Sequence, residues 1–180
     1  MNGSPRPRST PSEQPRPGKA AIEVVSHRAR GLRLRWLPGQ LKQLQLLLDG
    51  HSFWAGGRST RQLRRMLAGS QAVVSAWSGA RLVGFGRASS DGVFRAVLWD
   101  VVVAEDQQGQ GLGRRIVEAL ITSPTLERVE RVYLMTTNSS GFYRQLGFQQ
   151  VRSQQLMLRS QDDGRDTEAE TSHGVSDEMN

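Results

Sequence analysis

The chain has 180 residues, enough for one domain with a sizeable core, and it contains no cysteine. Disulfides, thiolate metal sites and a covalent acyl-cysteine intermediate are therefore excluded, and we expect no bound metal. The formal net charge is +7, and because residues 161–180 hold seven acidic and one basic residue, the middle of the chain is strongly basic. A basic protein suits nucleic acid or a ligand with several phosphates. No aromatic-and-basic ribbon accompanies the charge, so we expect no nucleic-acid partner.

Both ends of the chain have the composition of disordered tails. Residues 1–20 contain five prolines and almost no apolar side chain, and residues 161–180 are acidic without periodicity. The sequence therefore predicts one folded domain over residues 21–160 between two tails. No apolar run approaches the roughly 20 residues that span a bilayer, so we expect a cytoplasmic protein with no membrane partner.

The first part of the domain shows one strand pattern and two helix patterns. Apolar residues alternate with arginines over residues 31–37, which predicts the first strand. A helix is predicted to begin at Pro38, and a second is indicated by Ser59 and Gln62, which are spaced as a capping box. The first helix carries an apolar stripe of Leu41, Leu44, Leu47 and Leu48.

Strand patterns then lead into and out of the centre of the chain. Turn signals at residues 78–79 and 91–92 indicate hairpins, and a strand-helix-strand order further on indicates a parallel crossover. The predicted elements are strands over 73–77, 81–88 and 93–103, a helix containing 116–121, a strand over 131–136, a helix over 139–146 and a last strand over 149–158.

Residues 98–121 read as a strand, a glycine loop and a helix. Asp100 is the only charge in the apolar run 98–103 that precedes the loop. Free N–H groups and the helix dipole at the start of a helix attract an anion, and glycines let a pyrophosphate approach the backbone. Arg114 and Arg115 add charge just behind the loop. The alternative is a turn that is rich in glycine only for tight packing.

Two phosphate-binding fingerprints do not fit this loop. The dinucleotide pattern G-x-G-x-x-G fails because Ile116 stands where a third glycine, counted from Gly113, would fall. The nucleoside-triphosphate pattern needs a lysine directly after a glycine loop, and the only lysines are Lys19 and Lys42.

The loop resembles the coenzyme A signature Q/R-x-x-G-x-G/A of the GNAT superfamily of N-acetyltransferases, and a second family pattern, F-Y-x-x-L-G-F, resembles residues 142–148. The resemblance covers about residues 30–158. Within the superfamily, residues 98–103 followed by 108–113 most resemble the cyanobacterial and plastid branch, which includes serotonin N-acetyltransferase-like and protein-lysine acetyltransferases. It implies an α/β (α+β) GNAT fold with a mixed central sheet of about six to seven strands and about four helices, splayed where the cofactor enters.

The resemblance also implies the reaction. Acetyl-CoA is the expected acetyl donor, and direct transfer to a primary amine is expected, either to an arylalkylamine such as serotonin or to a protein lysine or N-terminus. The expected assembly is a monomer or a homodimer, located in the plastid if the source is a plant. A non-catalytic acyl-CoA-binding module with the same core is the alternative.

Cofactor contacts are implied for the strand, the loop and the second motif. Backbone N–H groups around Val101, Val102 and Val103 are expected to polarise the thioester carbonyl. The other implied contacts are Gln108, Gly109, Gln110, Gly111, Leu112, Gly113, Arg114, Asn138 and Arg144. The family's asparagine usually precedes the tyrosine by seven positions, where Thr136 stands here, so either Asn138 takes its role through a shorter loop or the contact is lost.

Two residues are the first candidates for catalysis. Tyr143 aligns with the family tyrosine that protonates the leaving thiolate. An alkylammonium acceptor must also lose a proton, and Asp100 is the preferred base, with Glu105 and Asp106 as weaker choices. Structural roles compete with both assignments, because Tyr143 can simply pack its ring and Asp100 can be a hydrogen-bonded group of the strand.

An aromatic loop between the first two helices carries Phe53 and Trp54, and in the family this segment helps to wall the acceptor site. The two rings could equally cap the core. His51 in the same segment is a further candidate base, without an orienting partner in the sequence.

Overall fold

The structure, a computed structural model, describes residues 21–28 and 36–159. It contains a mixed sheet with the strand order β1-β2-β3-β4-β5, in which the first four strands are antiparallel and β5 runs parallel to β4. The strands are β1 (Ile22–Arg28), β2 (Ala72–Ser78), β3 (Arg81–Ser90), β4 (Arg95–Val103) and β5 (Arg131–Tyr133).

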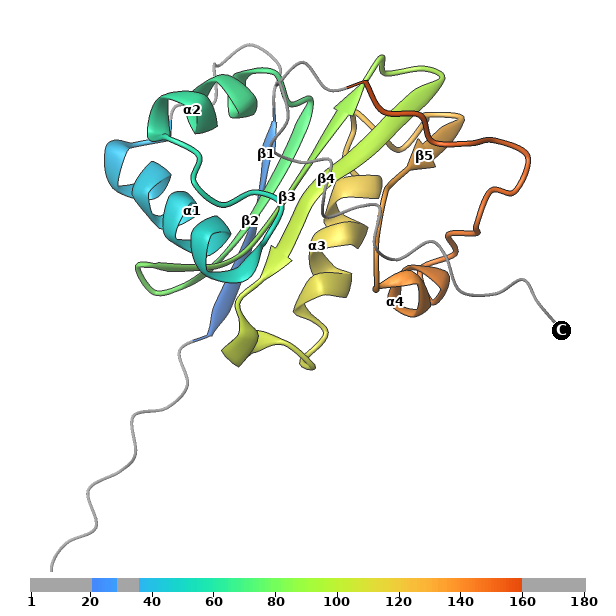
Figure 1. The fold of residues 1–180 in the computed structure, drawn as a ribbon. Helices are drawn as coiled ribbons and strands as arrows, with labels where there is room; N and C mark the ends of the chain where they lie inside the picture. The colour runs from blue at the N-terminus through green and yellow to red at the C-terminus, as the bar shows by residue number, and fades with distance from the viewer. Residues whose placement is uncertain (1–20, 29–35, 160–180) are drawn as a thin grey trace, which may run out of the picture.

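Helices cover both faces of the sheet. Helices α1 (Pro38–His51) and α2 (Thr60–Ala68) lie on one face, and α3 (Leu112–Ile121) and α4 (Ser140–Arg144) lie on the other (Figure 1). This is the mixed α/β architecture that the resemblance implies. No helix within the part of the chain that the structure describes is long and apolar enough to cross a membrane.

The first two helices form as predicted. The leucine stripe of α1 is buried against the sheet. At the start of α2 the Ser59 hydroxyl accepts a hydrogen bond from the Gln62 backbone at 3.3 Å, while the Gln62 side chain accepts one from the Ser59 N–H at 2.7 Å. This reciprocal capping box satisfies two donors that a helix start would otherwise leave unpaired.

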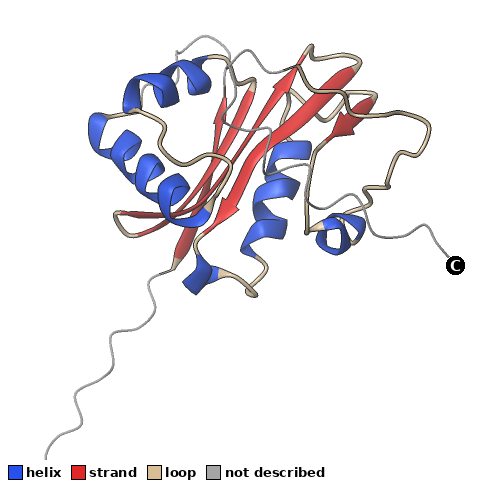
Figure 2. Cartoon of the chain, viewed as in Figure 1, coloured by secondary structure: helices blue, strands red, loops and turns tan. Residues whose placement is uncertain are grey.

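The prediction of a last strand over residues 149–158 is wrong, and the described residues contain five strands rather than six or seven. Figure 2 shows this segment as a loop beyond α4. Leu156, Met157 and Leu158 are each more than three-quarters exposed. The backbone of a strand needs a ladder partner, and β5 extends over only three residues.

The first strand differs from its prediction as well. Most of the predicted strand over 31–37 lies outside the described residues, and Trp36, which is described, is a buried core residue just before α1. The observed edge strand is β1, which pairs antiparallel with β2 along its whole length. His27 of β1 donates or accepts a 2.7 Å hydrogen bond with the Ser75 hydroxyl, so this polar side chain is satisfied inside the sheet.

Strand β4 departs from regular pairing on both sides. Toward β5 the ladder covers only residues 95–97 of β4 and 131–133 of β5, and among the described residues the remainder of β4 has no strand on that side. Toward β3, Gly86 alone stands opposite Asp100 and Val101, which is a β-bulge. Asp100 accordingly adopts a positive φ of 51°.

Helix α3 approaches the sheet closely at Gly86. A Cβ atom at Gly86 would lie 2.8 Å from Cγ2 of Ile116 and 3.0 Å from Cδ1 of Leu120, both of which are fully buried. The absence of a side chain at this position therefore sets the distance between α3 and the bulge.

We expect Gly86→Ala to lower the free energy of unfolding by about 1–3 kcal/mol, because the added methyl group overpacks a closed core. Urea denaturation measures the change. The control is Gly39→Ala in α1, where an added Cβ meets nothing within 4 Å and helix propensity predicts no loss or a gain of up to about 1 kcal/mol. Equal stability of the two variants would contradict this account of the α3 contact.

Candidate active site

The glycine loop lies between β4 and α3. Strand β4 ends at Val103, a short turn of 3-10 helix covers Glu105–Gln107, and α3 begins at Leu112. Gly109 and Gly111 have φ values of 71° and 76°, a region that other residues enter at a cost. The loop therefore needs glycine at positions 109 and 111 for its backbone conformation, which is why the glycine pattern of the sequence predicts it.

The start of α3 offers unpaired donors to an anion. Its first intrahelical hydrogen bond runs from the Arg115 N–H to the Gly111 carbonyl, so the N–H groups before Arg115 have no partner within the helix. The first turn contains no acidic residue. Arg114 pairs with Glu118 at 3.4 Å, and both side chains are nearly half exposed, so this guanidinium can turn to a phosphate at small cost.

The second motif packs directly against this loop. A Cβ atom at Gly113 would lie 3.4 Å from the Phe142 ring. Tyr143 is half-buried, with its ring edge-to-face against Phe142 at 4.9 Å and Phe148 at 5.8 Å. Burial raises the pKa of the Tyr143 phenol above its ordinary value. The contact between Gly113 and Phe142 brings together two motifs that are about thirty residues apart in the chain.

The ends of α4 carry the two remaining candidate contacts. Asn138 is exposed in the turn before α4, where its Oδ1 accepts a hydrogen bond from the Ser139 hydroxyl at 3.2 Å. Arg144 is exposed at the last position of the helix. Asn138 thus precedes and Arg144 ends the helix whose Phe142 packs against Gly113, and neither side chain is buried.

The gap between β4 and β5 leaves backbone groups of β4 available. Val101, Val102 and Val103 lie beyond the short parallel ladder, so in the part of the chain that the structure describes their outward-facing N–H and C=O groups meet no strand on that side. Of these groups, the Val103 carbonyl accepts a 3.0 Å hydrogen bond from the Gln108 side chain. An open edge of this kind is where an extended ligand can add to a sheet.

On the face of β4 that points away from α3, two guanidinium groups hold the Asp100 carboxylate. Its Oδ2 accepts hydrogen bonds from Nε of Arg87 at 2.7 Å and from Nη1 of Arg58 at 3.2 Å, and its side chain is 5% exposed. Arg58 comes from the loop before α2 and Arg87 from β3. The carboxylate thus ties the bulge to two other elements, a structural role that exists whether or not it also takes a proton.

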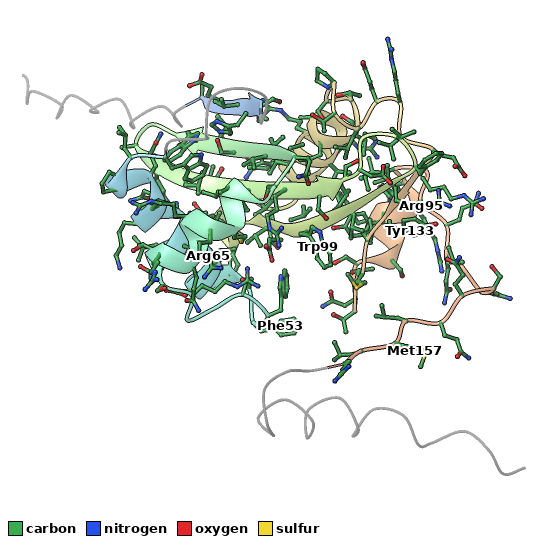
Figure 3. All side chains as sticks on the ribbon, turned by 90° about the horizontal axis from the view of Figure 1, so that it is seen from above. Phe53, Arg65, Arg95, Trp99, Tyr133 and Met157 are labelled. Atoms are coloured by element: carbon green, nitrogen blue, oxygen red, sulfur yellow. The ribbon has the colours of Figure 1, made fainter. Side chains whose placement is uncertain are left out.

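The structure adds Trp99 to the candidate site. The Arg87 guanidinium lies 5.6 Å from the centre of the Trp99 ring, whose N–H donates to the Ser89 hydroxyl at 2.8 Å. Figure 3 shows Trp99 and Phe53 on the same side of the sheet, between α2 and the segment that carries Met157. The lone charge in an apolar strand signals that Asp100 needs cationic partners, but no local pattern identifies Arg58, Arg87 or the Trp99 ring beside Arg87.

The predicted acceptor wall lies at the surface. Phe53 is 82% exposed and Trp54 is 50% exposed, and their rings meet edge-to-face at 4.9 Å. These rings therefore do not cap the core, and they are free to contact a ligand. His51 lies at the end of α1, where it lines a shallow hollow together with Gln43 and Arg81.

The weaker base candidates lie in the turn after β4. Asp106 makes a bidentate ion pair with Arg81 at 2.8 and 2.9 Å, and this hydrogen bonding lowers the pKa of the Asp106 carboxyl, which makes it a poorer base. Glu105 is exposed. Within residues 21–28 and 36–159 no group of three or more potential metal ligands occurs.

We expect Asp100→Asn to lower the free energy of unfolding by about 1–3 kcal/mol, because two guanidinium groups lose the charge that balances them. Chemical denaturation measures the loss. The control is Asp106→Asn, which breaks an ion pair that is half exposed on both sides and should therefore cost less. Unchanged stability of Asp100→Asn together with loss of turnover would instead support a purely catalytic carboxylate.

Relatives of known class match the chain over its central part. The model of the acetyltransferase (GNAT) family matches residues 42–148. Serotonin N-acetyltransferase 2, chloroplastic, of Oryza sativa subsp. japonica is 43% identical over 96 residues, which make up 51% of this chain and 48% of that protein. Histone acetyltransferase TAP1 of Glycine max is 41% identical over 70 residues, 38% of this chain and 30% of that protein. The chain thus spans less than half the length of these relatives.

Solved structures share the fold at lower identity. A GNAT-family acetyltransferase from Streptococcus pneumoniae has a TM-score of 0.62 at 20% identity, covering 79% of this chain and all of that one. The ribosomal-protein-S18-alanine N-acetyltransferase of Escherichia coli has a TM-score of 0.57 at 18% identity, covering 73% and 79% of the two chains. A family match over more than half of the sequence, on the fold that the family adopts, shows that the chain belongs to the acetyltransferase (GNAT) family.

Proposed function

We propose that the protein transfers an acetyl group from acetyl-CoA directly to a primary amine, either an arylalkylamine such as serotonin or a protein lysine or N-terminus. The observation that carries the proposal is the contact between Gly113 and Phe142, which joins the glycine loop to the helix of Tyr143 beside the open edge of β4. Names of the relatives include both serotonin and histone acetyltransferases, which supports an amine acceptor without choosing between the two classes.

The residues present fit an acetyl-CoA donor. Backbone N–H groups at the start of α3 and the Arg114 side chain suit its pyrophosphate. The open β5 side of the β4 backbone suits the extended pantetheine arm, and Asn138 before α4 and Arg144 at its end are further proposed contacts. The proposed set also contains Val101, Val102, Val103, Gln108, Gly109, Gln110, Gly111, Leu112 and Gly113. Acetyl-CoA supplies the acetyl group as a thioester, which an amine can attack.

The chain's own groups then serve the two proton transfers that the reaction needs. A new N–C bond forms as the C–S bond breaks, the amine gives up a proton, and the departing sulfur gains one. We propose Tyr143 as the donor to sulfur, since its hydroxyl has no hydrogen-bond partner among the described residues and its buried phenol keeps its proton. Backbone N–H groups near Val101–Val103 would stabilise negative charge on the carbonyl oxygen.

The acceptor is proposed to bind on the face of the sheet that carries α1 and α2. Phe53, Trp54 and Trp99 offer aromatic surface there, which suits an aromatic ring on the amine. Asp100 lies beside Trp99 and remains the proposed base, although its position between two arginines also makes it a positioning residue. For the location, we propose the cytoplasm, or the plastid if the source is a plant, since the rice relative is named chloroplastic.

The proposal is tested by release of free CoA thiol from acetyl-CoA with a panel of arylalkylamines, polyamines, amino acids and lysine peptides. We expect acceptor-dependent release with at least one class. Binding of CoA without release on any acceptor would favour a non-catalytic acyl-CoA-binding module.

We expect Tyr143→Phe to lower kcat by at least about 100-fold while CoA binding is retained, because only the proton donor is removed. Steady-state kinetics and calorimetric titration with CoA measure the two quantities. The chain's other tyrosine offers a matched control, since Tyr133→Phe removes one hydroxyl from the end of β5. A similar small effect of both substitutions would refute the role of Tyr143.

The pH profile gives an independent test of the same group. A phenol donates below its pKa, and burial raises the pKa of Tyr143 above the usual 10.0. We therefore expect kcat to rise or stay level between about pH 7 and pH 9, since the small neutral fraction of an amine with a pKa of about 10.4 grows over this range while Tyr143 keeps its proton. A falling limb in this range that disappears in Tyr143→Phe would contradict the raised pKa.

A further inference from the structure

One surface of the protein concentrates positive charge that the fold leaves unbalanced. The exposed side of α2 carries Arg61, Arg64 and Arg65, and we call these three residues the arginine face. None of them makes an ion pair with an acidic residue in the part of the chain that the structure describes. This sets them apart from Arg58 just before the helix, which pairs with Asp100.

The arrangement is unfavourable for the helix by itself. Residues three and four positions apart are neighbours on a helix surface, so Arg61 faces both Arg64 and Arg65, and like charges at this spacing repel. The first turn of α2 contains no acidic residue that could offset them. Two exposed arginines elsewhere are balanced by acidic partners, since Arg81 pairs with Asp106 and Arg95 pairs with Glu130. An anionic partner from elsewhere would remove the repulsion.

The acidic residues of the chain are distributed so as to supply such a partner. Of seventeen acidic residues, seven lie between positions 162 and 178, against a single arginine, Arg165. They are Asp162, Asp163, Asp166, Glu168, Glu170, Asp177 and Glu178. This acidic stretch begins three residues after Arg159, the last residue that the structure describes. The chain thus contains both an unbalanced basic helix and a complementary acidic segment.

We propose that residues 162–178 of the chain bind to its own arginine face. Charge complementarity favours this occupant. Because the acidic segment is covalently attached to the domain, its binding is intramolecular, with an effective concentration in about the millimolar range. An extended chain spans about 3.3 Å per residue, so even ten residues reach about 33 Å, comparable to the size of the domain. Carboxylate–guanidinium hydrogen bonds would hold the contact.

The location gives the contact a consequence for the site. Helix α2 follows the loop that carries Phe53, and Figure 3 shows Arg65 and Phe53 on the same side of the molecule. An acidic segment on the arginine face would therefore lie beside the proposed acceptor wall. The inference itself concerns the contact and does not depend on the proposed reaction.

The absence of cysteine makes a clean distance measurement in the full chain possible. Two cysteines are introduced, Ala68→Cys at the exposed end of α2 and Ser172→Cys within the acidic stretch, and are labelled with a donor and an acceptor fluorophore. We expect high energy-transfer efficiency at low salt and a marked fall at about 1 M salt, where the screening length shrinks to about 3 Å.

Two triple substitutions test whether the acidic segment binds the arginine face or another basic surface. Arg61→Gln, Arg64→Gln and Arg65→Gln together should reduce the low-salt efficiency to its high-salt value, and glutamine preserves helix propensity. The control set, Arg95→Gln, Arg128→Gln and Arg131→Gln, removes the same charge from the β5 side and should leave the efficiency unchanged. Circular dichroism checks that α2 and the fold survive in both variants.

Two results would overturn the proposal. One is an efficiency that does not respond to salt, or that responds equally to both triple substitutions. The other is a low efficiency in the unsubstituted chain combined with binding of a duplex oligonucleotide that requires the three arginines of α2, which would assign the arginine face to nucleic acid instead. Neither result depends on turnover, so failure here is distinguishable from failure of the proposed reaction.

Discussion

The bulge in β4 is the constraint on which the rest of the site depends. Because Asp100 and Val101 together oppose Gly86, the strand bends and gains twist at the point where its parallel ladder with β5 has already ended. Among the described residues, β4 has no strand on its β5 side from residue 98 onward, so the bulge lies within the stretch of β4 that borders this gap.

Holding that bulge has a cost, which the surrounding residues offset. A positive φ at a residue other than glycine costs about 1–2 kcal/mol, and Asp100 adopts one while burying a carboxylate. The hydrogen bonds from Arg58 and Arg87 compensate the buried charge and connect the bulge to the loop before α2 and to β3. On the other face, Gly86 lets α3 close over the same point. Position 100 is therefore fixed from both sides of the sheet.

Features that depend on residues close together in the sequence could be predicted, and features that depend on distant residues could not. Helix α1, the capping box of α2 and the glycine loop depend on neighbouring residues, and all three form as predicted. The partners of Asp100 lie 42 and 13 residues away, and no local pattern identifies them. The last predicted strand failed for the same reason, because residues 149–158 do not themselves show whether a sheet edge is long enough to pair with them.

The two faces of β4 divide the proposed reaction between them. An added Cβ at Gly86 would touch Val101 and Ile116, and one at Gly113 would touch Val103, so Val101 and Val103 lie toward α3 and the glycine loop. Trp99 lies with Arg87 on the face that Arg58 and α2 approach. The bulge is the point at which these two environments meet on one strand. Donor binding and acceptor choice can therefore change separately, because they draw on different helices and share only the backbone between them.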